Sequence, residues 1–156
     1  MWYGIGNTGV KNPSNAKLEL SLDGSMILYV GAADIGQGST TVLAQIAASV
    51  LGIEPSEIQL VVADTMLTPL AGHTSASRQT YITGNAVKAA AIRFANSMII
   101  EAEKTLDTPR EMLELRAGCV QNKEIPGIRV RLSEIAKWSG GLMHLYDKGF
   151  DIRRIQ

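Results

Sequence analysis

The stretch Met26-Ile27-Leu28-Tyr29-Val30-Gly31-Ala32-Ala33-Asp34-Ile35-Gly36-Gln37-Gly38-Ser39-Thr40-Thr41 decides the fold, because an apolar run passes through a glycine turn into a helical pattern. Apolar residues then recur at the spacing of one helix face, at Leu43, Ile46, Ala47 and Val50. The pattern predicts a strand, a turn and a helix. The hydroxyl of Ser39 or Thr40 can cap the first helical turn, and Gly52 and Pro55 end the helix.

Two further strands and a second helix flank this unit. An alternation of Leu18, Leu20 and Leu22 with polar residues, followed by Asp23-Gly24, predicts a β-hairpin with the strand at 26–30. Residues 58–62 are expected to form the next strand. A helix between Tyr81 and Lys104 is marked by one apolar face, formed by Val87, Ala90, Ala91, Phe94 and Met98.

The last third of the chain has shorter patterns. Thr108-Pro109-Arg110-Glu111 has the spacing of a capping box and predicts a helical turn. A second hairpin is expected over 113–120, then a strand at 128–130 and a helix from Ser133 to Trp138. We predict an α+β fold of two layers, with two long helices on one face of an antiparallel or mixed sheet. Residues 1–138 would form the domain, and residues 139–156 a peripheral tail.

Composition excludes several classes of protein. With 156 residues, 46% of them apolar and 19% charged, the sequence is that of one globular domain or a piece of something larger, not of a disordered or coiled-coil protein. Fifteen basic residues balance fifteen acidic ones, which gives no reason to expect nucleic acid or an anionic membrane as a partner. One cysteine, Cys119, and no signal peptide or membrane span predict the cytoplasm.

The first candidate site is the glycine turn Gly36-Gln37-Gly38 with Ser39, Thr40 and Thr41. Glycines let backbone amides approach a ligand, and the helix that follows presents unpaired N–H groups that favour an anion such as phosphate. The turn lacks the third glycine of a Rossmann fingerprint and the Gly-Lys pair of a Walker loop. The alternative is an ordinary strand-to-helix turn that needs glycine only for its backbone angles.

The second candidate site is the polar loop over 68–80. Hydroxyls, an imidazole, an amide and the guanidinium of Arg78 gather there before the alanine-rich helix, as donors for a polyanionic ligand. The alternative is a solvated loop. His73 has no metal-ligating partner nearby, and Cys119 reads as a small core residue. Ser75 and Ser77 show neither the Ser-His-Asp order nor the nucleophile-elbow pattern of acyl-transfer enzymes.

At these two sites the sequence resembles the molybdenum-cofactor-binding part of the xanthine dehydrogenase and aldehyde oxidase family. The similar segments are Ala33-Asp34-Ile35-Gly36-Gln37-Gly38-Ser39-Thr40-Thr41-Val42-Leu43-Ala44-Gln45, Ala63-Asp64-Thr65, Thr74-Ser75-Ala76-Ser77-Arg78 and Gly84-Asn85-Ala86-Val87. The resemblance runs from about Lys17 to Val130. Paired motifs at this separation are far more specific than one glycine turn.

The resemblance implies a molybdopterin, in some bacterial members extended by cytosine dinucleotide, and hydroxylation of an aldehyde or N-heterocycle with oxygen from water. The metal would be held by the pterin dithiolene, so no protein metal ligand is expected. Iron–sulfur and flavin (FAD) groups would be on partner domains or subunits. The residues implied as cofactor-binding are Gly36, Gln37, Gly38, Ser39, Thr41, Thr74, Ser75, Ala76, Ser77, Arg78, Gln79 and Thr80.

One element of the family pattern is missing. Family members carry a glutamate in a glycine-rich segment further along the chain, which acts as base toward the metal-bound hydroxide. Glu54, Glu101 and Glu134 are in no matching context. No catalytic residue is therefore expected in this chain, which would be one domain of a longer subunit and inactive alone. Two other readings are left open: a non-catalytic module that binds a phosphate or nucleotide, and a purely structural or degenerate domain.

Overall fold

The computed structural model describes residues 13–139 and the backbone of residues 143–150. A four-stranded sheet, in the order β3-β2-β1-β7, forms one layer of the domain. Its strands are β1 (Ser14–Leu20), β2 (Met26–Val30), β3 (Ile58–Val62) and β7 (Met143–Phe150). β1 pairs antiparallel with β2 and β7, whereas β2 and β3 are parallel. The predicted mixed sheet is confirmed.

Side-chain alternation sets the register of the predicted hairpin. Leu18 lies opposite Leu28, and Leu20 lies opposite Met26. All four are buried, because residues two apart on a strand share one face and that face is covered. The hairpin turn is stabilised by Asp23, whose Oδ1 accepts hydrogen bonds from the backbone amide and the hydroxyl of Ser25.

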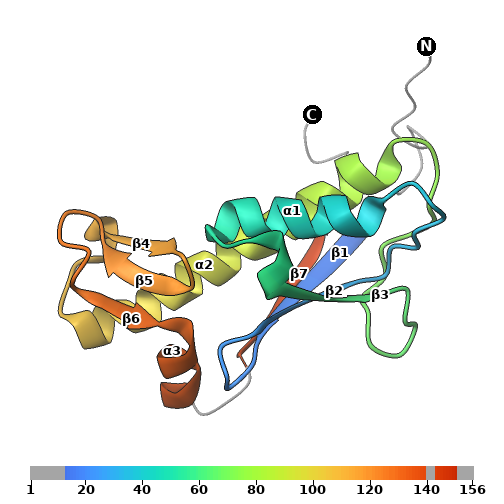
Figure 1. The fold of residues 1–156 in the computed structure, drawn as a ribbon. Coiled ribbons are helices and arrows are strands. Elements are labelled where there is room, and N and C mark those ends of the chain that lie inside the picture. The colour runs from blue at the N-terminus through green and yellow to red at the C-terminus, as the bar shows by residue number, and fades with distance from the viewer. Residues whose placement is uncertain (1–12, 140–142, 151–156) are drawn as a thin grey trace.

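Two helices form the second layer, on one face of the sheet, as Figure 1 shows. They are α1 (Ser39–Leu51) and α2 (Gly84–Leu106), which pack against each other. Their small residues allow close approach, and Leu43, Ala47, Ala90, Ala91 and Phe94 are buried in the shared core. Helix α1 ends as predicted at Gly52, whose φ of 65° suits glycine and whose amide donates to the carbonyl of Ala48.

The connection from β2 through α1 to β3 decides where a site can lie. Because β2 and β3 are parallel, their carboxyl ends meet at the same edge of the sheet. The loop at 31–38 leaves β2 at that edge, and the loop that starts at Ala63 leaves β3 there. Ligands of open sheets bind outside the carboxyl ends of parallel strands. The topology therefore places both candidate segments at one edge.

A second, smaller sheet lies by the carboxyl-terminal half of α2 (Figure 1). It contains β4 (Leu113–Arg116), β5 (Cys119–Asn122) and β6 (Arg129–Arg131), in that order and antiparallel, and is followed by α3 (Leu132–Trp138). The predicted second hairpin, strand and short helix are thereby confirmed. Three short helical turns complete the description: Pro55–Glu57, Gln79–Thr83 and Arg110–Met112.

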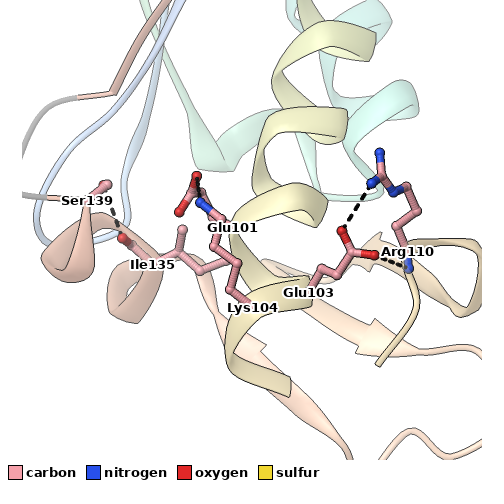
Figure 2. A network of polar contacts seen from close by, with 6 residues as sticks. All are labelled: Glu101, Glu103, Lys104, Arg110, Ile135 and Ser139. Carbon is pink, nitrogen blue, oxygen red and sulfur yellow. Dashed lines mark hydrogen bonds and ion pairs between the residues drawn. The ribbon is translucent and has the colours of Figure 1, made fainter. Parts of the chain in front are cut away.

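Polar contacts near the end of α2 link it to the segment that leads into β4 (Figure 2). Glu103 accepts a hydrogen bond of 3.1 Å from the backbone amide of Arg110 and pairs with its guanidinium at 3.4 Å. Lys104 pairs with Glu101 at 2.8 Å. The helical turn expected after Thr108 is present, but the capping box is not, because the hydroxyl of Thr108 donates to the carbonyl of Leu106.

The expectation of a peripheral tail after residue 138 is wrong for residues 143–150. These residues form β7, which pairs with β1 from Leu20↔Met143 to Ser14↔Phe150. The sequence of this segment has no clear alternation, so the strand is recognised only from its backbone pairing with β1. Among the described residues, no helix is long and apolar enough to span a membrane.

Removal of the largest apolar side chain of the α2 core should destabilise the domain strongly. Phe94 is fully buried, so Phe94→Ala loses its transfer free energy and leaves a cavity, at a cost of about 3–5 kcal/mol. Lys104→Ala is the control on the same helix, because its exposed ion pair contributes less than about 1 kcal/mol. Urea unfolding followed by circular dichroism measures both. Equal losses in the two variants would contradict the described core.

Candidate functional site

The loop between β2 and α1 is shaped by two glycines in the left-handed region. Gly36 has a φ of 97° and Gly38 a φ of 74°. A Cβ at either position would meet nothing within 4 Å, so the requirement for glycine comes from the backbone angle and not from crowding. Glycine is therefore required at both positions by the shape of the turn itself.

Asp34 organises this loop. Its Oδ1 accepts hydrogen bonds from the amides of Gly36 (2.9 Å) and Gly38 (3.3 Å), and its Oδ2 accepts from the amide and hydroxyl of Thr40 (3.1 and 3.0 Å). These hydrogen bonds lower the pKa of Asp34 from 3.8 to about 2. The bond from the Thr40 amide contributes most, and the bond from the Gly36 amide contributes next. The carboxylate thus sits where a bound anion would.

The predicted cap of α1 is therefore wrong. Gly38 is the N-cap residue, and the first turn is capped by the side chain of Asp34 in place of the hydroxyl of Ser39 or Thr40. An acidic side chain six residues from Thr40 accepts these bonds because the glycines fold the loop back over the helix end. The sequence signal was an aspartate just before a Gly-x-Gly turn.

Gln37 folds over the same loop. Its Oε1 accepts from the amide of Ile35 at 2.6 Å. Its Nε2 donates to the carbonyl of Ala33 at 3.3 Å and to the hydroxyl of Ser39 at 3.1 Å. Ser39 is buried beneath it, whereas Thr41 is exposed in the first turn of α1. The amide of Gln37 is exposed as well, so it lies within reach of a ligand.

The two candidate segments meet at one backbone atom, the carbonyl oxygen of Ala33. The hydroxyl of Thr74 donates to this oxygen at 2.7 Å, across 41 residues of sequence. Gln37 donates to the same oxygen from the other segment. The glycine turn and the 74–77 turn are therefore neighbours in space, as the resemblance required. No sequence pattern pointed to the Ala33 carbonyl as the junction.

Small, exposed residues occupy the outer surface of the second turn. Ser75, Ala76 and Ser77 are exposed, and Ala76 adopts a φ of 47°. The turn is closed by the amide of Arg78, which donates to the carbonyl of Ser75 at 3.1 Å. It leads into the helical turn Gln79–Thr83 and then into α2, and neither has an acidic residue in its first turn. This end is therefore suited to an anion.

Arg78 and Gln79 lie beneath this turn rather than on its surface. Arg78 is 1% exposed and Gln79 is 3% exposed, whereas Thr80 is exposed. Burial lowers the pKa of the Arg78 guanidinium. The structure does not place the side chains of Arg78 and Gln79 where a ligand on the outer surface could touch them.

An apolar cavity of about 520 Å³, which the sequence did not indicate, adjoins the two loops. Its lining comes from the end of β2 and from the loop after β3, and includes Gly31, Ala33, Ala63, Pro69 and Leu70. Around it, large apolar side chains are exposed in the same loops: Ile35, Met66, Leu67 and Leu70. Apolar loop residues give no periodic signal, so sequence analysis could not find this cavity.

The remaining candidates lie apart from the junction or lack partners for chemistry. Cys119 is half-buried on β5 in the second sheet, Glu101 is paired near the end of α2, and Glu134 is on α3. His73 is exposed. Within residues 13–139, no group of three or more histidine, cysteine or acidic residues is placed to hold a metal ion. Protein ligands for a metal are thus absent from the part of the chain that the structure describes.

The fold and the site together define a class: an α+β domain with two loops that meet at one carbonyl at the edge of its sheet. The molybdopterin cofactor-binding domain model matches residues 1–150. The chain belongs to this family of molybdenum oxidoreductase domains, as its resemblance to the xanthine dehydrogenase and aldehyde oxidase family implied.

Curated relatives support the same assignment. The chain is 32% identical over 114 residues to the xanthine dehydrogenase molybdenum-binding subunit of Escherichia coli. This alignment covers 72% of this chain and 15% of that protein. It is 36% identical over 106 residues to the 6-hydroxypseudooxynicotine dehydrogenase complex subunit gamma of Paenarthrobacter nicotinovorans. That alignment covers 68% of this chain and 13% of the relative. The chain therefore spans about a seventh of the length of these relatives.

Solved structures show the same fold. The CO dehydrogenase of Oligotropha carboxidovorans superposes with a TM-score of 0.78 at 25% identity, over 90% of this chain and 18% of that chain. The aldehyde oxidoreductase of Desulfovibrio desulfuricans gives a TM-score of 0.60 at 27% identity, over 94% of this chain and 14% of that chain.

The residues of this site fit a molybdopterin. The exposed hydroxyls of Ser75 and Ser77 supply donors for pterin and phosphate oxygens. Gln37 is exposed beside them, with both Nε2 hydrogens donated within its own loop. The small, exposed side chain of Ala76 between the serines would leave space for the metal that the family implies. A group that brings its own sulfur ligands also needs none from the protein. The sequence suggested an anion at the start of both helices; Asp34 occupies the start of α1, whereas the turn Gln79–Thr83 and α2 begin without an acidic residue.

The stability contributed by the Asp34 charge should disappear in acid. Because the folded-state pKa is lowered from 3.8 to about 2, the contribution is complete above about pH 4 and is lost as the pH falls through 2. Asp34→Asn keeps an acceptor oxygen but carries no charge at any pH. We expect the wild-type chain to melt at the higher temperature at pH 6, with the difference shrinking between pH 4 and pH 2. A difference that stays constant over this range would contradict the role of the charge.

Proposed function

We propose that this chain forms the part of a molybdenum hydroxylase that cradles the cofactor, holding a molybdopterin between residues 33–41 and 74–80. The observation that carries this proposal is the junction at the Ala33 carbonyl, which receives both Gln37 and Thr74. Membership of the family supplies the identity of the ligand, and the donors at the two loops supply the means to hold it.

Each segment has its own task in this proposal. The glycine turn lets the ligand approach the loop, and Nε2 of Gln37 exchanges its bond to the buried Ser39 hydroxyl for one to the part of the cofactor nearest the metal, with Thr41 beside it. The turn over Ser75, Ala76 and Ser77, with Thr80 behind it, donates to the pterin and its phosphate. When bound, the cofactor supplies oxidative hydroxylation with oxygen from water.

The finer identity of the assembly is part of the same proposal. Relatives called a molybdenum-binding subunit and a complex subunit gamma support the presence of partner subunits. From the family resemblance we propose that partners carry iron–sulfur and FAD groups and that the remaining parts of the molybdenum subunit complete the assembly. We propose a cytosine dinucleotide form of the cofactor, an aldehyde or N-heterocyclic substrate, and a cytoplasmic location. No side chain of the described residues is proposed as the catalytic base.

The chain by itself should neither hydroxylate substrate nor retain the cofactor tightly. A missing general base alone removes about 10²–10⁴-fold in rate, and only one side of the cofactor would be covered. Molybdenum content and dye reduction by an aldehyde or purine, measured on the purified chain, test this. A purified chain that retains molybdenum and turns over substrate would refute the prediction.

Two substitutions in the assembled enzyme test the cradle directly. Gln37→Ala and Ser77→Ala each remove a donor, and the loss of one hydrogen bond of about 0.5–1.5 kcal/mol weakens cofactor retention by roughly 2–10-fold. Ser56→Ala, in the exposed turn Pro55–Glu57, is the matched control. Molybdenum per subunit after gel filtration is the readout. Unchanged molybdenum in both variants would contradict the cradle, whereas an assembly that holds a nucleotide and no molybdenum would favour the non-catalytic binding module.

A further inference from the structure

We infer that Arg78 and Gln79 are positioning residues that act together as a clasp, holding the 71–74 segment of the loop from beneath so that the turn at 75–77 faces outward before any ligand binds. This inference rests on the proposed function, since it deepens the account of the same site. It gives these two residues a role that does not require them to touch the cofactor.

The Gln79 half of the clasp is a chain of hydrogen bonds across the domain. The hydroxyl of Ser14, on β1, donates to the hydroxyl of Thr83 at 2.9 Å, and Thr83 donates to Oε1 of Gln79 at 2.7 Å. Nε2 of Gln79 donates to the hydroxyl of Thr74 at 3.0 Å, which donates to the carbonyl of Ala33. The chain therefore runs from the sheet to the junction of the two loops.

The direction of this chain is fixed by its last member. The carbonyl of Ala33 only accepts, so Thr74 must use its single proton there and must accept from Gln79. The amide nitrogen of Gln79 then faces Thr74, and its oxygen faces Thr83, which must donate. Ser14, Gln79 and Thr83 are all buried, where an unpaired polar group costs more than at the surface.

The Arg78 half grips the neighbouring residues of the loop. Its guanidinium donates to the carbonyl of Ala71, to that of His73 at 3.4 Å, and to that of Pro13 at 2.8 Å. Gly72 passes directly over the group, with a φ of 70°, and a Cβ there would lie 2.4 Å from a guanidinium nitrogen. The backbone at 71–73 therefore packs closely against the Arg78 guanidinium.

Adjacent residues of one helix start therefore hold consecutive parts of the loop. Arg78 holds residues 71 and 73, and Gln79 holds Thr74. The helix that carries them is itself fixed, because Ile82 and Thr83 are fully buried. A guanidinium that is 1% exposed cannot reach a ligand on the outer surface unless the loop opens. Positioning, and not direct contact, is the role this geometry allows.

The discriminating variants are at Thr83, which touches neither loop. Thr83→Val keeps the shape but removes the hydroxyl that donates to Gln79, whereas Thr83→Ser keeps the hydroxyl and loses a methyl group. Gln79→Glu is a third variant, because an ionised carboxylate cannot donate to Thr74 while a protonated one can. All are made in the assembled enzyme, once from a host that cannot synthesise molybdopterin and once from a host that can.

The cofactor-free preparation tests the clasp without the proposed function. The readout is hydrogen exchange of the Arg78 amide, which bonds to Ser75 at 3.1 Å, with the Ile53 amide, bonded to Ala48, as the internal reference. We expect exchange at Arg78 to rise about 10-fold in Thr83→Val and to stay within about 3-fold in Thr83→Ser, with Ile53 unchanged. In Gln79→Glu the rise should appear only as the new carboxyl ionises with increasing pH.

The cofactor-loaded preparation then shows whether the clasp serves the site. Molybdenum per subunit should fall in Thr83→Val and be restored in Thr83→Ser. Equal hydrogen exchange of the Arg78 amide in Thr83→Val and Thr83→Ser would overturn the clasp. An increase in exchange at Ile53 equal to that at Arg78 would overturn it as well. Faster exchange with unchanged molybdenum would overturn its role in positioning. A wild-type enzyme without molybdenum would refute the proposed function, while the exchange comparison would still decide the clasp.

Discussion

The hydrogen bond between the Thr74 hydroxyl and the Ala33 carbonyl is the contact on which the site depends. It joins loops that are 41 residues apart, and Gln37 donates to the same oxygen from within the first loop. The parallel pairing of β2 and β3 makes this contact geometrically possible, since both loops leave the sheet at one edge. A domain with an antiparallel pair at this position would put the two loops at opposite edges.

Much of the fold could be predicted from the sequence because its elements carry local signals. The turn at Asp23-Gly24, the stop at Gly52 and the apolar face through Phe94 each specify structure within a few residues. Strand β7 could not be predicted, because its partner β1 lies more than a hundred residues away and supplies the backbone hydrogen bonds that define it. The sequence of β7 has no clear alternation of its own, and the alternation in β1 does not show which distant segment pairs with it.

The candidate site was predicted as a set of residues but not as an arrangement. The motifs correctly brought the glycine turn and the serine turn together, yet they assigned Arg78 and Gln79 the same outward role as Ser75 and Ser77. In the structure Arg78 and Gln79 are buried, whereas Ser75 and Ser77 are exposed. Burial depends on the packing of the whole chain and is not encoded in the local motif. Likewise, Asp34 reads in the sequence as one more polar loop residue, and only the folded loop brings three amides and a hydroxyl to its carboxylate.

The carboxylate of Asp34 also makes the two joined loops electrically unlike. The first loop carries a negative charge that stays ionised well below neutral pH, whereas the second leads into a helical turn and a long helix with no acidic residue in the first turn of either. Because the amide of Thr40 at the start of α1 is already bonded to the chain's own carboxylate, a negatively charged group gains more from the start of the second helical segment.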